Sequence, residues 1–543
     1  MSCNISVLDC TLRDGAYICN SMFGVATIKG IIRKLEEARV DVIECGWLKN
    51  DAHKMGSSYY HIPSDLEQYL SKKNSGTDYV VMIDWDRYNL DYLPQCDHKS
   101  IDAVRVVFPY GKYIEGISVG RKIAEKGYRV YFQAANTLAY SDSDLIGLAH
   151  ELNKINPVAL SVVDTFGAMY EEDLERIVSV LNQALNPEIK LGFHSHNNQQ
   201  LSFALSIHFI KLMQKMKRDI VVDASLCGMG RGAGNTTTEL LVNYLNNKCG
   251  KHYDMDAIMD AIDVYMSYFQ ENYSWGYSTP YFIAGNYQCH VNNIAYLLKN
   301  HRTNAKDMRN IISSLTQEER RKYDYDLLEE KYLNNQSMYV DDRQTIDVLT
   351  CSLSGRSVVL IAPGASALSE KDRIDDYIKA NKSVVIGVNA VLPGYKYDYL
   401  FFVNSARYEY AKEAYPKEFS VCRKIVASNV KNTAGENEMI IDFNKVIKRG
   451  WRYFDNAAIC ALRLMDLLGL QKAAIAGFDG FKTKYNESYA DKFLPSLNPD
   501  GRWEELNTEI KEIYADFAYN TQNIKDIVFI TKSYFAPKVN LND

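Results

Sequence analysis

Short apolar runs alternate with longer amphipathic segments over the first 250 residues of the chain. Each run is rich in Val, Ile, Phe or Tyr and is too short for a helix, so we expect buried strands. The predicted strands are Ile5–Asp9, Val42–Gly46, Tyr79–Ile83, Ala103–Val107, Arg129–Gln133, Ala159–Val163, Lys190–His194 and Ile220–Ala224. The segments between them carry apolar residues every three or four positions, which predicts helices. Examples are Gly24–Arg39, Glu115–Lys126, Asp142–Asn153 and Glu171–Leu185.

This alternation predicts a parallel sheet with helical crossovers. Eight strand–helix units within residues 1–250 fit the size and strand number of a TIM (β/α)8 barrel, so the fold class is α/β. An open, doubly wound sheet is the structural alternative, because it has the same alternation of elements.

The pattern changes twice after residue 250. Residues 251–350 lack strand-like runs, and we expect a helical appendage followed by a linker around Asn334–Asp347. The expected helices there are Asp254–Phe269, Val291–Lys299 and Asn304–Tyr332. A second α/β pattern then predicts a Rossmann-like domain over residues 351–543. Its predicted strands are Val358–Ala362, Val384–Val388, Tyr399–Val403, Lys424–Ala427, Ala473–Gly477 and Ile527–Thr531, and its predicted helices are Leu368–Ala380 and Asn456–Leu468.

Composition narrows the class of protein. A chain of 543 residues is too long for one hydrophobic core, which agrees with two or three domains. The net charge of -6 gives no electrostatic case for binding nucleic acid or an acidic membrane. We expect no secretion signal and no membrane span, because no apolar run approaches the roughly 18 residues required. Eleven scattered cysteines without a CxxC pair favour reduced thiols in a cytoplasmic protein.

The polar residues that follow the predicted strands carry the chemistry, because reacting groups of a barrel lie at the carboxyl ends of its strands. Arg13 and Asp14 follow the first strand, and His194 and His196 end the seventh. Residues two apart on an extended segment point the same way, so both imidazoles can face the barrel axis. Two histidines and one carboxylate are a common set of ligands for Mn²⁺, Fe²⁺, Co²⁺ or Zn²⁺. Packed or surface histidines remain the alternative for such a pair.

Arg13 has a mechanistic interpretation beside the metal site. Cleavage of the bond between the α and β carbons of a keto compound leaves an enolate. A guanidinium aimed at the enolate oxygen stabilises its negative charge. The alternative is a structural pair between Arg13 and a carboxylate.

Weaker candidates surround these residues. The glycine-rich stretch Gly228–Asn235 would form a loop over the site, in which Asn235 either binds the metal or caps the next helix. Polar residues on or after other strands are candidate substrate contacts, although each could instead pack inside the barrel or cap a helix. They are Glu44, Arg105, Asn136, Asp164 and Thr165. We interpret His53, His61 and His290 as structural, because they lack a partner pattern.

Three motifs resemble the DRE-TIM metallolyase superfamily, and the resemblance covers roughly residues 1–300. They are Leu8–Gly15 (LDCTLRDG), Gly192–Asn197 (GFHSHN) and Gly232–Asn235 (GAGN), in the right order at the right strand ends. The resemblance implies a Mn²⁺- or Mg²⁺-type ion held by Asp14, His194 and His196, with Arg13 on the enolate oxygen. Mn²⁺ is our first expectation, and Co²⁺ or Zn²⁺ would also suit these ligands.

Within that superfamily, the chain resembles the 4-hydroxy-2-oxovalerate aldolase branch most. The Claisen-type synthases carry Glu-Gln after the Arg-Asp-Gly motif, where this chain has Ala16-Tyr17. The segment Ala284–Tyr287 resembles the one that holds the active-site tyrosine of the aldolases, which implies a catalytic Tyr287. The lyase branch uses a cysteine in its glycine loop, but Gly228–Asn235 has none, and we expect the preceding Cys227 to be packed.

The position of Tyr17 departs from the aldolase pattern, in which a histidine acts as the base there. A phenol with an ordinary pKa near 10 is a poor base at neutral pH. Tyr17 would therefore act as an acid, donate a hydrogen bond, or only shape the pocket.

The sequence therefore predicts a metal-dependent aldolase that cleaves a 4-hydroxy-2-keto acid to pyruvate and an aldehyde, or runs the reverse reaction. An acyl-CoA or Claisen-type lyase or synthase on the same metal site is the first alternative. A barrel without turnover that serves polysaccharide synthesis is the second. A homodimer is compatible with either role.

The second α/β domain contains a turn of small residues, Pro363–Leu368, directly after a predicted strand. Such a turn can hold a phosphate at a helix N-terminus, although a compact strand–helix turn is equally consistent. It is neither a P-loop nor a dinucleotide motif. Together with Leu467–Leu470 and Ala476–Gly480, it resembles the Rossmann-like domains of bacterial sialyltransferase-like and polysaccharide-associated proteins. A nucleotide or nucleotide-sugar is the expected ligand, but all ten histidines lie at or before His301, so a histidine base is not expected in this domain.

Overall fold

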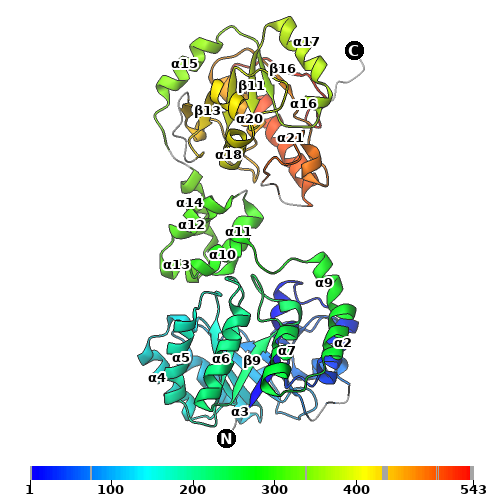
Figure 1. The fold of residues 1–543 in the computed structure, drawn as a ribbon, viewed down its shortest axis with the longest axis vertical. Helices are drawn as coiled ribbons and strands as arrows, with labels where there is room; N and C mark the ends of the chain where they lie inside the picture. Colours follow the sequence, from blue (N-terminus) through cyan, green and yellow to red (C-terminus); the bar gives the residue numbers. More distant parts are fainter. Residues whose placement is uncertain are drawn as a thin grey trace. The chain divides into compact units, whose positions relative to one another are not determined.

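The computed structural model describes residues 3–71, 73, 76–301, 303–336, 339–430, 438–496, 498 and 501–537. The chain divides into two compact units, which are described separately (Figure 1). The barrel unit comprises Met1–Ile294 and Gln317–Lys322, and the C-terminal unit comprises Ala295–Thr316 and Tyr323–Asp543.

The barrel unit is a closed ring of eight parallel strands. They are β1 (Ile5–Asp9), β2 (Val42–Leu48), β4 (Asp78–Asp84), β5 (Ala103–Phe108), β6 (Arg129–Ala134), β7 (Ala159–Asp164), β8 (Lys190–Ser195) and β9 (Ile220–Ala224). Each strand pairs with the next, and β9 and β2 both pair with β1, where Leu8 lies opposite Val42. This pairing closes the sheet, so the TIM-barrel prediction is confirmed and the open-sheet alternative is wrong. The two-residue strand β3 (Tyr59–Tyr60), which the sequence did not predict, adds to the end of β2.

Helices cover the outside of the ring, as Figure 1 shows for α5, α6 and α7. They are α2 (Val25–Glu37), α3 (Tyr113–Glu125), α4 (Asp142–Asn153), α5 (Glu171–Ala184), α6 (Ser202–Met216) and α7 (Thr238–Cys249). Helix α4 shows how the sequence sets such an element. It begins after Ser141, whose side chain accepts from the amide of Asp144, and it buries Leu145, Leu148 and Leu152 on one face. Each buried leucine contributes roughly 1.5–3 kcal/mol.

Inside the ring, apolar and polar side chains form successive layers. One buried apolar cluster fills the interior of the barrel. Its members are Leu8, Cys10, Val42, Val80, Ala103, Tyr131, Ala159 and Val221. Because side chains of a strand alternate between its faces, residues two positions later point inward again, one layer closer to the carboxyl ends. Glu44, Arg105 and Asp223 occupy these positions after Val42, Ala103 and Val221. The barrel therefore places buried charges directly beneath its functional end.

The described residues between 251 and 350 form helices and turns. The elements are α8 (Met255–Ala261), a π-helical turn (Ile262–Met266), α9 (Ser267–Asn272), α10 (Thr279–Asn286), α11 (Val291–Asn300), α12 (Ala305–Ser313), α13 (Gln317–Arg321), α14 (Tyr325–Gln336) and α15 (Arg343–Leu353). The prediction of one helix over Asn304–Tyr332 was wrong, because Asp324 accepts from the amides of Asp326 and Leu327 and so starts α14 anew. The predicted linker is also too long, since α15 begins at Arg343; residues 337 and 338 lie outside the described residues.

The C-terminal unit contains a seven-stranded parallel sheet in the order β14-β13-β12-β11-β10-β15-β16. The strands are β10 (Val358–Ile361), β11 (Val384–Val388), β12 (Tyr399–Phe402), β13 (Arg423–Ala427), β14 (Glu438–Ile441), β15 (Lys472–Ala476) and β16 (Asp526–Phe529). The order reverses at β10, as in Rossmann-like sheets, which agrees with the predicted fold class. The sequence did not predict β14, a short edge strand that is largely half-buried.

Among the described residues, no helix combines the length and the apolar character that crossing a membrane requires.

Candidate metal centre

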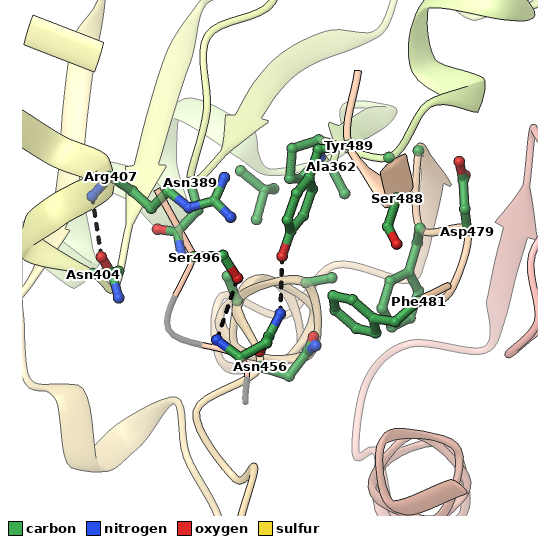
Figure 2. A pocket seen from close by; sticks show the side chains of 18 of the residues that line it. Ala362, Asn389, Asn404, Arg407, Asn456, Asp479, Phe481, Ser488, Tyr489 and Ser496 are labelled. Carbon is green, nitrogen blue, oxygen red and sulfur yellow. Dashed lines mark hydrogen bonds between the residues drawn. The ribbon is translucent and has the colours of Figure 1, made fainter. Parts of the chain in front are cut away.

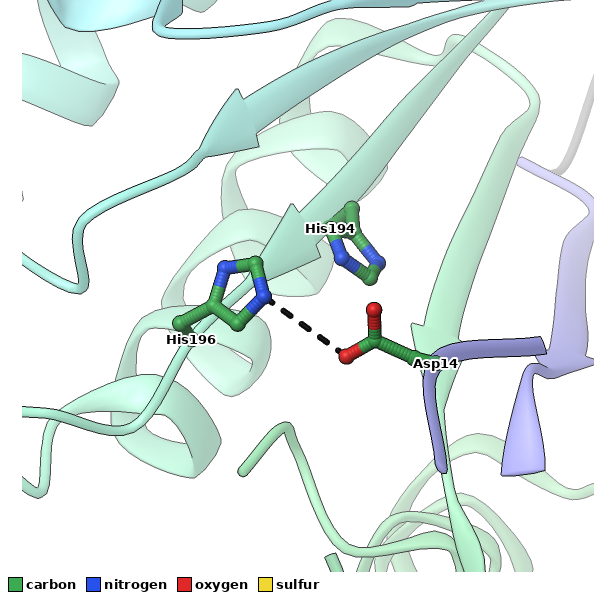
Figure 3. A group of neighbouring side chains, drawn as sticks. All are labelled: Asp14, His194 and His196. Carbon is green, nitrogen blue, oxygen red and sulfur yellow. Dashed lines mark ion pairs between the residues drawn. The ribbon is translucent and has the colours of Figure 1, made fainter. Parts of the chain in front are cut away.

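Asp14, His194 and His196 meet at the carboxyl end of the barrel, as the sequence predicted. Asp14 ends the short helix α1 (Thr11–Asp14), whose turn is closed by the Cys10 carbonyl accepting from the amides of Arg13 and Asp14. His194 lies on β8, and His196 follows that strand. One possible ligand atom from each of the three residues lies within 4.8 Å of the others. Figure 3 shows both imidazoles beside the Asp14 carboxylate.

Both imidazoles are held through Nδ1, which leaves Nε2 of each ring as the atom that could bind a cation. His194 Nδ1 lies 3.0 Å from Asp223 Oδ2, and His196 Nδ1 lies 3.1 Å from the carbonyl oxygen of Asp164. Such contacts behind a metal ligand fix its tautomer and orientation. Burial lowers the pKa of His194, which favours the neutral form that can bind a cation.

Two polar atoms at this point remain unsatisfied within the described structure. His196 Nε2 and Asn235 Oδ1 are buried without a hydrogen-bond partner, and His196 Nε2 lies 3.6 Å from Asp14 Oδ2. Asn235 Nδ2 donates to Asp14 Oδ2 at 2.7 Å, so the amide oxygen of Asn235 is left over. Buried lone pairs of this kind are normally satisfied. A divalent cation would satisfy them, and the nitrogen and oxygen ligands present suit such an ion.

Behind the metal ligands, five buried charges form a chain, which we call the ionic network: Asp14, Arg13, Glu44, Arg105 and Asp223. Arg13 contacts Asp14 at 2.6 Å and Glu44 at 2.7 Å. Arg105 contacts Glu44 at 2.8 Å and Asp223 at 2.5 Å. Since Asp223 also holds His194, the ionic network connects Asp14 to His194, two of the candidate metal ligands.

The alternation of signs keeps these charges ionised. Burial alone would raise the pKa of Asp14, but Arg13, His196 and His194 outweigh it and hold that pKa well below its usual value. Burial likewise opposes ionisation of Asp223, and Arg105 and His194 lower its pKa nonetheless. Both carboxylates are therefore negative at neutral pH, which is the state that binding of a cation at Asp14 would require.

The structure places the other expected pocket residues in two groups. Glu44 and Arg105 are fully buried in the ionic network, so their role as substrate contacts stays a prediction. Asp164 accepts from the amides of Ala168 and Met169, and its burial raises its pKa to about 6. Asn136 has a left-handed backbone with φ of 55°, and its amide donates to Thr165 Oγ1 at 2.6 Å.

Tyr17 lies at the mouth of the barrel with 40% of its surface exposed. Its ring packs edge-on against Trp47 at 6.1 Å, and the guanidinium of Arg231 lies 4.7 Å above it. The surrounding side chains raise the pKa of Tyr17 by desolvation, although Arg231 opposes this. Tyr17 is therefore a neutral phenol, which can donate a hydrogen bond.

The glycine-rich loop lies directly on the metal ligands. A Cβ on Gly230 would come within 2.5 Å of Asp14 Oδ2, and the amide of Arg231 donates to that oxygen at 3.3 Å. The guanidinium of Arg231 also donates to Asn292 Oδ1 at 2.6 Å. Because Asn292 is the second residue of α11, this hydrogen bond connects the loop to the start of that helix.

Tyr287 and His290 lie on the connection between α10 and α11. Tyr287 is half-buried with the guanidinium of Arg320 5.1 Å from its ring, and its catalytic role stays a prediction. Burial, together with the charges of Arg231 and His196, lowers the pKa of His290 to about 3. His290 therefore lies near the metal ligands, which the sequence alone did not indicate.

Sequence reasoning also passed over Asp223 and Arg231. A signal for Asp223 existed: it follows Val221 by two positions on an otherwise apolar strand, so it had to face the barrel interior. Arg231 is the only charged residue in the stretch Gly228–Asn235.

The matches to known proteins include one that lies within the barrel unit. The HMGL-like family model matches residues 114–264. The chain is 26% identical over 247 residues to 4-hydroxy-2-oxovalerate aldolase 2 of Comamonas testosteroni, which covers 44% of this chain and 67% of that protein. It is 29% identical over 258 residues to 4-hydroxy-2-oxovalerate aldolase 2 of Salinispora arenicola, covering 45% of this chain and 70% of that protein.

Two further similarities were found. Oxaloacetate decarboxylase of Mycobacterium tuberculosis is 26% identical over 271 residues, covering 47% of this chain and 74% of that protein. Among solved structures, the N-terminal domain of a candidate aldolase from Bacteroides vulgatus is 25% identical with a TM-score of 0.49, covering 57% of this chain and 100% of that domain.

Proposed function

We propose that the barrel unit, a DRE-TIM metallolyase domain close to the 4-hydroxy-2-oxovalerate aldolase branch, is a divalent-metal-dependent aldolase acting on 4-hydroxy-2-keto acids. The observation that carries the proposal is the meeting of Asp14, His194 and His196, with His196 Nε2 buried and unsatisfied among the described residues. The names of the aldolase relatives supply the substrate class. Pyruvate and an aldehyde would be the products of cleavage.

Asp14, His194 and His196 would hold the metal, with Asn235 Oδ1 as a further ligand. Mn²⁺ is our expectation among the divalent ions that suit such ligands. A bound ion would polarise the C2 keto oxygen of the substrate and so favour cleavage of the C3–C4 bond, which leaves an enolate of pyruvate.

Arg13 would supply a second positive charge to the same oxygen. Asp14 and Glu44 fix its guanidinium from two sides, so it needs no rearrangement when negative charge builds up on the substrate. A donor placed in advance in this way typically lowers a barrier by about 3–4 kcal/mol. Arg13 is only 5% exposed, so water does not screen its charge strongly.

Tyr17 would act on the aldehyde side of the reaction. As a neutral phenol it can donate a hydrogen bond to the oxygen that alternates between the 4-hydroxyl and the aldehyde. We assign it this role instead of the base role of the histidine in the aldolase branch. Tyr287 is the second tyrosine that we expect to act there.

Decarboxylation of a 2-keto diacid is a second candidate, supported by the similarity to the oxaloacetate decarboxylase. It breaks a carbon–carbon bond at the same distance from the keto group, so the same residues would serve. The Claisen-type alternative has less support, because Ala16-Tyr17 replaces the Glu-Gln of those synthases.

Proton exchange into pyruvate tests the shared step of both candidates. The purified chain is incubated with pyruvate and Mn²⁺ in D₂O. A chelator then removes the ion before measurement, and NMR follows the loss of the methyl proton signal of pyruvate. We expect exchange in the wild type and its loss in His194→Ala and Arg13→Ala. His252→Ala, a change at an exposed histidine, should leave exchange intact.

The proposal would be contradicted if the wild type showed no exchange with any of the divalent ions tested. Among active preparations, release of pyruvate from 4-hydroxy-2-oxovalerate would support the aldolase, and release only from oxaloacetate would support the decarboxylase. A strict requirement for CoA would instead favour the acyl-CoA alternative.

A further inference from the structure

The C-terminal unit contains a partly open pocket at the carboxyl edge of its sheet (Figure 2). Segments that follow β10, β11, β12 and β15 line it, together with the start of α20 (Ala457–Leu467). Strand order reverses between β10 and β15, and parallel sheets of this type bind ligands where the order reverses.

The turn after β10 does not offer its amides to a phosphate. The amide of Gly364 donates to the Gly477 carbonyl at 2.8 Å, and that of Ala365 donates to the Ser488 carbonyl at 3.2 Å. The amide of Ser366 donates to Asp479 Oδ2 at 2.8 Å, so a carboxylate of the chain already occupies the anion position. The compact-turn interpretation therefore fits this segment, and a phosphate would have to bind elsewhere in the cavity.

Arg407 provides a positive charge on another wall. It belongs to α18 (Ser405–Ala414), whose first turn is capped by Asn404, and it is only 7% exposed. Its guanidinium stacks 4.6 Å from the ring of Tyr489, which fixes its direction. Figure 2 shows Arg407 and Asp479 well apart, with Tyr489 between them, so the cationic end of the cavity is separate from the closed turn.

The start of α20 supports the same end electrostatically. Asn456 caps this helix by accepting from the amide of Ile459 at 3.2 Å, and the first two residues, Ala457 and Ala458, line the cavity. A helix N-terminus carries partial positive charge, which adds to that of Arg407. The small alanine side chains leave room for a ligand to approach the backbone.

Aromatic and amide side chains form the rest of the lining. Phe478 and Phe535 pack with ring centres 4.4 Å apart, and Phe481 meets Tyr489 edge-on at 6.1 Å. The side chain of Asn498 donates to the hydroxyl of Tyr489 at 3.0 Å. Aromatic faces suit a planar base, and amides suit ring hydroxyls. A free phosphate or a simple sugar would use only part of this lining.

We propose that this cavity binds a nucleoside phosphate, with the phosphate at Arg407 and the first turn of α20 and the base against the aromatic side chains. The ligand is either the nucleotide itself or a nucleotide that carries a sugar, since both share this chemistry. This proposal does not rest on the function proposed for the barrel.

Calorimetric titration of the full chain tests the proposal. The probes are ADP, GDP, CDP and UDP, the corresponding nucleosides, UDP-glucose and GDP-mannose, and inorganic phosphate and pyrophosphate. We expect at least one nucleotide to bind more than 10-fold tighter than its nucleoside and than either inorganic anion. Arg407→Ala should weaken that binding by at least 10-fold, Arg407→Lys by less, and the exposed Arg423→Ala by nothing measurable.

Tighter binding of the sugar conjugate than of its diphosphate would identify a nucleotide-sugar, and the reverse would identify the nucleotide. The proposal would be overturned if no nucleotide bound. It would also be overturned if pyrophosphate bound as tightly as the best nucleotide. Full affinity in an Arg407→Ala protein would overturn it too. If Arg407→Ala fails to fold, as judged by its melting curve, Arg407→Lys alone decides the matter, and unchanged affinity there overturns the proposal.

Discussion

Asp223 holds His194 from behind, with 3.0 Å between the carboxylate Oδ2 and the imidazole Nδ1. The same oxygen contacts Arg105, so the position of a candidate metal ligand depends on a buried ion pair inside the barrel. Through Arg105, Glu44 and Arg13, this contact continues to Asp14. Two ligands from distant parts of the sequence are therefore aligned by one set of buried charges.

Asp223→Asn should weaken metal binding without emptying the site. The amide can still accept from His194, but it no longer offsets the charge of Arg105. Loss of a supporting carboxylate typically lowers metal affinity by roughly 10–100-fold. Because breaking a buried pair costs about 3–5 kcal/mol, the melting temperature should fall too. Titration of the apo-protein with Mn²⁺ measures the first effect, and Asp91→Asn at an exposed position is the control. Unchanged affinity would show that Asp223 does not position His194.

Metal affinity should depend on pH in one direction. Protons compete with the metal for imidazole nitrogen, and burial lowers the pKa of His194 below its ordinary value of 6.5. His194 is thus already neutral at pH 7, and Asp14 is ionised there because its pKa is held well below its usual value. We expect these two side chains to give a nearly constant Mn²⁺ affinity between pH 7 and 8, and a loss only at pH values below the ordinary histidine pKa of 6.5. An affinity that rises on acidification would contradict this assignment of the ligands.

Tyr17→Phe tests whether the phenol donates or accepts a proton. The pKa of Tyr17 is raised, so the hydroxyl keeps its proton up to and beyond pH 10. Removal of the hydroxyl should lower the rate of aldol condensation, in which the new 4-oxygen gains a proton, by about 10²–10⁴-fold, the usual contribution of a general acid. Exchange of the pyruvate methyl protons should survive, because that step does not involve the aldehyde. A wild-type rate that rises with pH through an ionisation absent from Tyr17→Phe would instead identify Tyr17 as a base.

Gly230→Ala should block the metal site by crowding. The new Cβ would lie 2.3 Å from Asn235 Nδ2 and 2.5 Å from Asp14 Oδ2, both of which would have to move. Gly230 is not among the residues with positive φ, so backbone strain does not confuse the result. We expect at least a 10-fold loss of Mn²⁺ affinity with little change in the melting temperature of the apo-protein. Retained affinity would mean that the loop moves away from Asp14 in solution.

Much of the barrel could be predicted from the sequence, because its strands are buried on both faces and read as continuous apolar runs. The predicted runs Ile5–Asp9 and Ile220–Ala224 coincide with β1 and β9. Strand β14 could not be recognised, since an edge strand such as Glu438–Ile441 is only partly buried and lacks that signal. The break before α14 was missed because the capping role of Asp324 competes with a helical pattern that continues on both sides.

The candidate metal ligands were predictable for a different reason. Asp14, His194 and His196 lie at strand ends, and strand ends of a barrel converge in space wherever they fall in the sequence. The ionic network was harder to predict, because pairing of Glu44 with both Arg13 and Arg105 depends on how the strands are staggered. His290 could not be placed at all, since only the fold of α10 and α11 brings it near His196.

Anomalous diffraction from crystals grown with Mn²⁺ tests the central claim most directly, because it locates the ion itself. We predict a peak about 2.1–2.3 Å from a carboxylate oxygen of Asp14 and from Nε2 of both His194 and His196, in line with usual ligand distances. A Mn²⁺ peak away from these three side chains, with the protein otherwise folded as described, would contradict the account.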